Sequence, residues 1–217
     1  MSKSAIAILL LGLLASLQYW RGRRLNLTLI RGLARQMEEV LSPAGKEYTW
    51  IGGYAGVIAR YDLENERYPE IKATISLLPH HSLLYLPVSI LLGRRDRVYL
   101  LIYSRKKLDG KAHVKPGKKT KPPHNISCLH YDQATIKGEM VQRYYDSEGE
   151  ANFLTSILWC LKSPFSVEHL AANVEENAYY ASVKIRRGDL AELFNCFLSP
   201  PDPDRRRHPF RGGKSRH

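Results

Sequence analysis

Residues 5–20 form an almost unbroken apolar run, AIAILLLGLLASLQYW, which ends in two aromatic residues. Three closely spaced arginines follow it. At a membrane boundary aromatic rings lie at headgroup depth and arginines extend toward water, so this order is typical of an interface. The run lies at the short end of what spans a hydrocarbon core. We predict a single transmembrane anchor whose interface residues are Tyr19, Trp20, Arg21, Arg23 and Arg24.

Two alternatives to an anchor are a cleaved signal peptide and a buried helix. A cleaved signal peptide needs a small-residue cleavage site, and Ala15-Ser16-Leu17 is a poor one. The arginines directly after the run also disfavour cleavage there. A buried helix of a soluble fold is the second alternative, but this helix would be apolar all round rather than along one stripe. We favour the anchor over both.

The charges on either side of the run predict its orientation. Only Lys3 precedes it, whereas several arginines lie within about 15 residues after it. Cytoplasmic flanks carry the excess of Lys and Arg, so the C-terminal side is predicted to be cytoplasmic. We therefore expect a single-pass membrane protein with its N-terminus outside and its main domain in the cytoplasm.

The cysteines agree with this compartment. Cys128, Cys160 and Cys196 are far apart and lack a CxxC spacing, so the sequence indicates neither a disulfide framework nor a zinc site. Each has apolar neighbours, which favours buried core cysteines over reactive nucleophiles. Reduced, buried thiols predict a reducing, cytosolic setting for the domain.

The charge of the chain is unevenly distributed. Its 217 residues include 33 Lys and Arg against 21 Asp and Glu, a formal net charge of +12. The excess lies in residues 1–24, 105–123 and 201–217. A content of 44% hydrophobic residues can bury a core, which excludes a histone-like or wholly disordered basic protein. We predict an anchor with a basic flank at 1–24, a cytosolic domain at 25–200 with a basic loop at 105–123, and a basic disordered tail at 201–217.

The domain is predicted to have an α+β fold, in which antiparallel hairpins pack with about four helices. Alternating apolar residues predict hairpins over 54–78 and 165–187, and a fully apolar run predicts a central strand at 98–104. Two further strands are expected at 126–133 and 140–146. One helix is expected to end at Ser42-Pro43. Three further helices are expected to cover 82–92, 147–162 and 189–198. The similar order of elements in 25–92 and 148–198 suggests two helix-hairpin-helix repeats.

Motifs for catalysis are lacking in the sequence. The glycines of WIGGYAG, at 50–56, have no phosphate-binding spacing and are better explained by a twisted strand. The pair His80-His81 and the scattered other histidines have no metal-ligand spacing. We predict a protein that is not an enzyme, with no catalytic residues, no cofactor, no metal and no small-molecule substrate.

The basic clusters are the candidate binding residues. Runs of Lys and Arg without apolar interruption bind polyanions such as ribosomal RNA or DNA. Anionic lipid headgroups attract such runs as well, and charge that merely solvates the protein is a third explanation. The candidates for nucleic-acid or lipid binding are Arg105, Lys106, Lys107, Lys111, Lys115, Lys118, Lys119, Lys121, Arg205, Arg206, Arg207 and Arg211.

Two stretches carry a resemblance to a known family. The order strand, turn, leucine-rich helix, strand in 67–104, and hairpin then closing helix in 164–200, resembles calumin, the endoplasmic-reticulum coiled-coil protein of the multipass translocon. The resemblance implies a single span followed by a cytosolic α+β domain and a basic extension. It also implies a non-enzymatic insertion factor or chaperone that works beside the Sec translocon under a bound ribosome.

On this resemblance, Arg205 to Arg207 and the 105–123 loop are expected to contact ribosomal RNA, and 5–20 is expected to lie in the lipid bilayer. The chain departs from the family in two respects. It has no acidic segment before the span, so calcium binding is not carried over, and its tail is short for the family's charged helix. A membrane-tethered adaptor that binds anionic lipid or another polyanion is the alternative function.

Overall fold

The computed structural model describes residues 2–117, 130–185 and 189–199. Its helices are α1 (Lys3–Leu41), α2 (Tyr85–Leu91), α3 (Glu148–Cys160) and α4 (Asp189–Leu198), with a short 3₁₀ helix at Pro164–Ser166. Its strands are β1 (Gly45–Ile51), β2 (Gly56–Asp62), β3 (Glu70–Ser76), β4 (Arg97–Tyr103), β5 (Ala112–Pro116), β6 (His130–Ile136), β7 (Glu139–Tyr145), β8 (Val167–Asn173) and β9 (Ala178–Lys184). The described chain therefore has the α+β composition that the sequence predicts.

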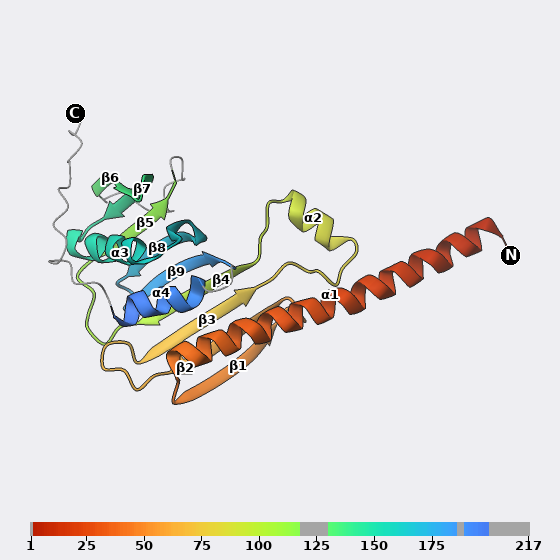
Figure 1. The fold of residues 1–217 in the computed structure, drawn as a ribbon, viewed down its shortest axis with the longest axis horizontal. Helices are drawn as coiled ribbons and strands as arrows, with labels where there is room; N and C mark the ends of the chain where they lie inside the picture. Colours follow the sequence, from red (N-terminus) through yellow and green to blue (C-terminus); the bar gives the residue numbers. More distant parts are fainter. Residues whose placement is uncertain (1, 118–129, 186–188, 200–217) are drawn as a thin grey trace.

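All of the described strands belong to one antiparallel sheet, in the order β1-β2-β3-β4-β9-β8-β5-β7-β6 (Figure 1). Strand β4 joins its two halves, because it pairs with β3 on one side and with β9 on the other. The hairpins β2–β3 and β8–β9 confirm the two predicted hairpins. The central position predicted for the apolar strand at 98–104 is confirmed as well.

The core lies on one face of this sheet. In β3 and β4 buried residues alternate with residues that are partly or fully exposed. The buried set includes Ile71, Ile75, Leu100 and Ile102, and it forms one cluster with the apolar faces of α1, α3 and α4. The opposite face carries the half-buried partners of this alternation, as period-two patterning requires.

Helix α1 is longer than the sequence predicts, because the anchor and the following amphipathic helix form one continuous helix of 39 residues. Its second half packs on the core through Ile30, Leu33, Met37 and Leu41. Its first half extends beyond the sheet (Figure 1). The helix ends as predicted at Ser42, whose φ of 42° is left-handed and whose N–H donates to the carbonyl of Glu38.

Other local signals are confirmed in the described chain. The Ser147 hydroxyl accepts a hydrogen bond from the backbone N–H of Glu150 and caps α3, as the capping box predicts. Helix α2 lies within the predicted 82–92 region and is followed by Gly93 at a φ of 71°. The structure does not show the helix-hairpin-helix repeats, because β1 adds a third strand after α1 and both halves share one sheet.

The prediction that 105–123 form a loop was wrong in part. Residues 112–116 form β5, which pairs with β7 and β8 inside the sheet. The strand signal is short because only Ala112 and Val114 face the core, while His113 and Lys115 are half-buried on the other side. Lysines and a proline around this five-residue alternation favoured a loop in the sequence.

Candidate membrane interface and basic surfaces

The first half of α1 exposes its apolar side chains. Ile8, Leu9, Leu11 and Leu14 each have more than half of their surface exposed. By length and composition this helix is able to cross a membrane, a property that anchors share with signal sequences. An exposed apolar helix joined without a break to a packed one is the main feature of this end of the molecule.

The domain touches α1 first at Gln18. The Nε2 of Gln18 donates a hydrogen bond of 2.8 Å to the carbonyl oxygen of His80. Two turns further on, the fully buried Asn26 donates through Nδ2 to the carbonyl of Leu78 at 3.0 Å, and its Oδ1 lies 2.7 Å from Nδ1 of His80. The connection from β3 to α2 is therefore fastened along α1 between residues 18 and 26.

This contact limits how the helix sits in a bilayer. Residues 3–17 are free of the domain but cover only about 22 Å at 1.5 Å per residue. A hydrocarbon core is about 30 Å thick and takes about 20 helical residues. If Lys3 lies at the far boundary, the near boundary falls at about residue 22, next to the fastened connection. An anchored domain would consequently lie directly against the membrane surface.

The predicted interface residues gather at this level of α1. Tyr19 and Trp20 are exposed, and the guanidinium of Arg24 lies over the Trp20 ring at 5.6 Å. Arg21 is exposed as well. Arg23 differs, because it is partly buried with its guanidinium 4.4 Å from the centre of the Tyr54 ring. Four of the five are thus exposed, and Arg23 is turned toward the domain.

The described basic residues of 105–115 differ in their surroundings. Arg105, Lys106 and Lys107 are exposed side chains just after β4. Lys111 forms an ion pair of 2.7 Å with Glu175, which raises the pKa of the lysine. Lys115 belongs to β5, and burial lowers its pKa. The first three are therefore the best placed for a polyanion, and Lys118, Lys119, Lys121, Arg205, Arg206, Arg207 and Arg211 lie outside the described residues.

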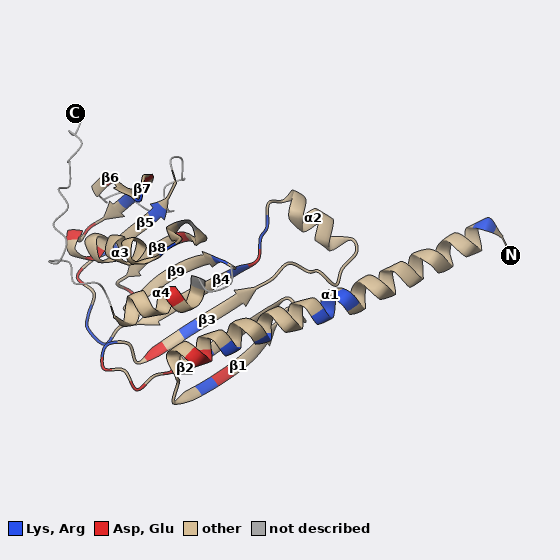
Figure 2. Ribbon diagram, in the orientation of Figure 1, with Lys and Arg blue, Asp and Glu red and all other residues tan. Residues whose placement is uncertain are grey.

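The exposed cations at 105–107 lie at the end of the domain away from the free half of α1 (Figure 2). The backbone agrees with this placement, because the N–H of Arg105 donates to the carbonyl of Arg67 in the turn between β2 and β3. That turn is at the opposite end of these strands from the β3–α2 connection. The basic cluster and the candidate membrane boundary therefore occupy opposite ends of the sheet.

A row of aromatic rings crosses the half-exposed face of the sheet and was missed in the sequence. Tyr99 stacks on Tyr180, which meets His169 edge-on, and His169 stacks on His113. His113 is the register partner of Tyr144, whose ring lies 5.0 Å from Tyr131. The six rings come from six strands, so only the strand register reveals the row. Such rings provide stacking surfaces for bases.

Burial within this row lowers the pKa values of its two histidines. Burial lowers the pKa of His169 to about 3, and the charge of Lys115 contributes. The pKa of His113 is lowered by burial too. The two rings approach with Nδ1 of His113 3.2 Å from Nε2 of His169. A neutral pair is therefore favoured, which leaves this row of rings uncharged at neutral pH.

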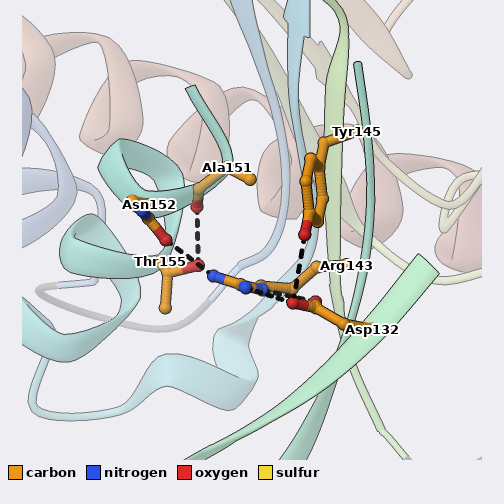
Figure 3. A network of polar contacts seen from close by, with 6 residues as sticks. All are labelled: Asp132, Arg143, Tyr145, Ala151, Asn152 and Thr155. Carbon is orange, nitrogen blue, oxygen red and sulfur yellow. Dashed lines mark hydrogen bonds and ion pairs between the residues drawn. The ribbon is translucent and has the colours of Figure 1, made fainter. Parts of the chain in front are cut away.

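The most buried charge in the described chain is Arg143 of β7, of which 4% is exposed (Figure 3). Its Nε donates to Asp132 of β6 at 2.6 Å, its Nη1 donates to Asn152 of α3 at 2.8 Å, and its Nη2 also contacts Asp132. The hydrogen bond with Asp132 raises the pKa of Arg143. The network ties β6 and β7 to α3.

The cysteine prediction was wrong in two respects. Cys160 at the end of α3 and Cys196 of α4 form a disulfide, and Cys160 is exposed rather than part of the core. The residues are 36 apart in sequence, and their proximity depends on the contact between the two helices. Disulfides occur mainly in oxidising compartments and in intracellular proteins of hyperthermophiles. The cysteines therefore no longer support a reducing setting, and Cys128 lies outside the described residues.

A groove of about 770 Å³ lies between α1 and β1, lined among others by Ile30, Arg31, Arg35, Tyr48 and Trp50. Two of its lining residues meet, because the Tyr48 hydroxyl donates to Glu38, a carboxylate whose pKa is lowered mainly by the hydrogen bond from Lys46. Among the described residues there is no group of three or more His, Cys, Asp or Glu that could hold a metal ion. The groove is thus lined by both apolar and charged side chains.

No family model matches this chain, and no curated protein matches it.

Proposed function

We propose that this chain is a membrane-anchored, non-enzymatic protein that assists the insertion of membrane proteins beside the Sec translocon and the ribosome. The observation that carries the proposal is the continuity of α1, whose free half is apolar and whose packed half belongs to the core. A continuous helix, with no break between its two halves, couples an anchor rigidly to a domain. The translocon and the ribosome are proposed as partners because the order of elements in 67–104 and 164–200 resembles that of calumin.

The two ends of the sheet support a division of roles. In an anchored molecule the free half of α1 faces lipid, and the exposed cations Arg105, Lys106 and Lys107 face the aqueous phase at the other end. Lipid headgroups of the same membrane attract cations only within about a Debye length, roughly 8–10 Å. A soluble polyanion such as ribosomal RNA therefore suits these three residues better than the anchoring membrane does.

The proposed localisation of the domain is the cytoplasm. The arginines after the apolar run support this orientation through the positive-inside rule. The disulfide between Cys160 and Cys196 is compatible with this orientation only where cytosolic disulfides persist. The orientation is tested by labelling Lys106 in sealed cells with a membrane-impermeant, amine-reactive reagent. A cytoplasmic Lys106 is labelled only after lysis.

The second candidate function is that of an adaptor for anionic lipid. Its support comes from Arg21 and Arg24 of α1, which the sequence already indicated as interface residues, and from the exposed Arg94 and Arg95 before β4, which it did not indicate. Each basic residue near an anionic surface contributes about 1 kcal/mol to binding. This candidate predicts that neutralising Arg94 and Arg95 weakens retention on anionic vesicles and leaves ribosome association unchanged.

Co-sedimentation with ribosome–translocon complexes tests the first candidate. The double variant Lys106→Glu/Lys107→Glu should reduce the bound fraction several-fold in solubilised membranes. Arg31→Glu/Lys162→Glu is the matched control, because it changes two exposed cations to the same extent elsewhere. Recovery of the full chain only in ribosome-free fractions, with and without a crosslinker, would contradict the proposal.

Salt dependence gives a second readout. Affinity falls as salt rises, and each lost phosphate contact should reduce the steepness of log affinity against log salt concentration by about 0.7–0.9. The double variant should therefore lower the slope for purified ribosomes by about 1.5, while the control should leave it unchanged. Equal slopes for both variants would mean that residues 106 and 107 do not contact RNA.

A further inference from the structure

Helix α2 and its flanks present an apolar surface outward. Leu84 is 77% exposed and Leu91 is 86% exposed, and the other exposed large apolar residues here are Leu83, Tyr85, Val88, Ile90 and Leu92. The buried residue of α2 is the small polar Ser89. This is the reverse of a helix packed on a soluble core, where the apolar side faces inward. A contiguous exposed apolar patch of this kind marks a surface that is covered when the protein works.

The segment is held at one particular level of α1. The residues just before it, 78–81, are bound by Gln18 and Asn26, and the Tyr19 ring meets the His81 ring edge-on. This is the level at which an anchored α1 leaves the hydrocarbon core. Figure 1 shows α2 outside the sheet, on the side where α1 leaves the domain. The apolar surface of α2 therefore lies on the side of the sheet where α1 leaves the domain, directly after a connection that is held on α1 at residues 18–26.

The sequence around α2 has the polarity of an interfacial element. Residues 82–93 contain no charged side chain, and Arg94 and Arg95 follow directly as exposed cations. Tyr85 provides an aromatic ring with a polar tip, which prefers headgroup depth. Arg21 and Arg24 on α1 are exposed as well, so two pairs of exposed arginines flank the apolar segments of α1 and α2. Anionic headgroups complement both.

We propose that residues 82–93 form a second membrane-contacting element, which lies in the interface of the leaflet on the domain side, where α1 leaves the bilayer. The partner surface is a phospholipid bilayer, and the contact rests on the proposed anchoring by α1. Amphipathic segments bind in this way by burying apolar side chains about 5–10 Å below the headgroups. Two contacts, one from α1 and one from α2, fix the tilt of the sheet relative to the membrane.

Site-directed spin labelling of the full chain in vesicles of phosphatidylcholine and phosphatidylglycerol tests this contact. Nitroxides are attached to Leu84→Cys or Leu91→Cys in a Cys128→Ser background, with the Cys160–Cys196 disulfide kept oxidised. Leu11→Cys reports on the anchor, and Lys106→Cys reports on the aqueous end of the domain. Collision rates with oxygen, which partitions into lipid, and with a water-soluble nickel chelate are measured for each label.

The proposal predicts that labels at 84 and 91 collide several-fold more with oxygen and several-fold less with nickel than the label at 106. If they resemble the label at 106 while the label at 11 is buried in lipid, α2 does not contact the membrane although the anchor does. If the label at 11 is also exposed to nickel, the anchoring itself fails. Protection from both reagents would indicate a protein partner, such as a second copy, and would overturn the proposal.

A charge variant keeps the test independent of the labelled leucines. The label is moved to Val88→Cys, with and without Leu84→Asp/Leu91→Asp, three positions that are all exposed and so leave the core intact. The aspartates should raise the nickel collision rate at position 88 several-fold, because carboxylates prefer water to the interface. An unchanged rate at position 88, together with an unchanged unfolding transition, would contradict the membrane contact.

Discussion

Gly22 of α1 and His80 of the β3–α2 connection meet backbone to backbone. A Cβ added at Gly22 would lie 2.1 Å from the carbonyl oxygen of His80, so only glycine permits this approach. The contact lies between the Gln18 and Asn26 hydrogen bonds and completes the joint between α1 and the connection. This joint sets the level of α2 relative to the anchor.

The first prediction concerns this joint. Gly22→Ala should lower the free energy of unfolding by about 1–3 kcal/mol, because the backbone of residue 80 must shift. Gly32→Ala is the control, since an added Cβ there has nothing within 4 Å, and it should stabilise the helix by about 0.5–1 kcal/mol. Chemical unfolding of both variants in detergent micelles measures the difference. Equal effects of the two alanines would show that the close approach is absent.

The second prediction concerns the buried ion pair. Asp132→Ala leaves the guanidinium of Arg143 buried without its carboxylate and should cost about 2–3 kcal/mol of stability, a value reduced because Asp132 is partly exposed. Glu175→Ala, which breaks the exposed pair with Lys111, should change stability little. Equilibrium unfolding of the two variants gives both values. A loss at Asp132 no larger than at Glu175 would exclude a role of the network in holding β6 and β7 to α3.

The third prediction is a pH dependence from His169. Its folded pKa of about 3 lies below the unfolded value of 6.5, so the unfolded chain binds the proton more readily as the pH falls. The stabilisation is complete above pH 6.5 and is lost as the pH falls toward 3. Between about pH 7 and pH 5 the wild type should lose about 1–2 kcal/mol more than His169→Gln. Parallel stability curves for the two proteins would contradict the burial of a neutral imidazole.

The fourth prediction concerns the disulfide. Removing the bond between Cys160 and Cys196 by Cys160→Ser/Cys196→Ala should cost about 3–4 kcal/mol, because it closes a loop of 36 residues in the unfolded chain. A reductant should lower the stability of the wild type and leave the double variant unchanged. Insensitivity of the wild type to the reductant, with both thiols free by mass spectrometry, would show that the bond does not form in the protein.

Local patterns in the sequence predicted much of the sheet and of the helices. Alternation at Ile71, Ala73 and Ile75 predicted β3, and the Ser147 cap predicted the start of α3. Strand β1 was missed because it lies at the edge of the sheet with nearly every side chain exposed. Buried and exposed residues therefore do not alternate along it. Strand β5 was missed because it is short and surrounded by lysines.

Features that depend on distant contacts were less accessible from sequence. The disulfide requires α3 and α4 to be neighbours, and the aromatic row requires the register of six strands. The leucines of 83–92 predicted a helix, but only the fold shows that Leu83, Leu84, Leu91 and Leu92 are exposed, on the side of the sheet where α1 leaves the domain. Tyr19 and Trp20, by contrast, were predicted as interface residues from the order of apolar, aromatic and basic residues alone, and in the structure both are exposed.

Alkaline carbonate extraction, followed by intact-mass analysis, tests the membrane anchoring by α1 most directly. Membranes from cells that produce the full chain are washed at high pH, which releases peripheral proteins and retains integral ones. The account predicts that the protein stays in the pellet with a mass that includes residues 3–24. Release into the supernatant, or a mass that lacks these residues, would contradict it.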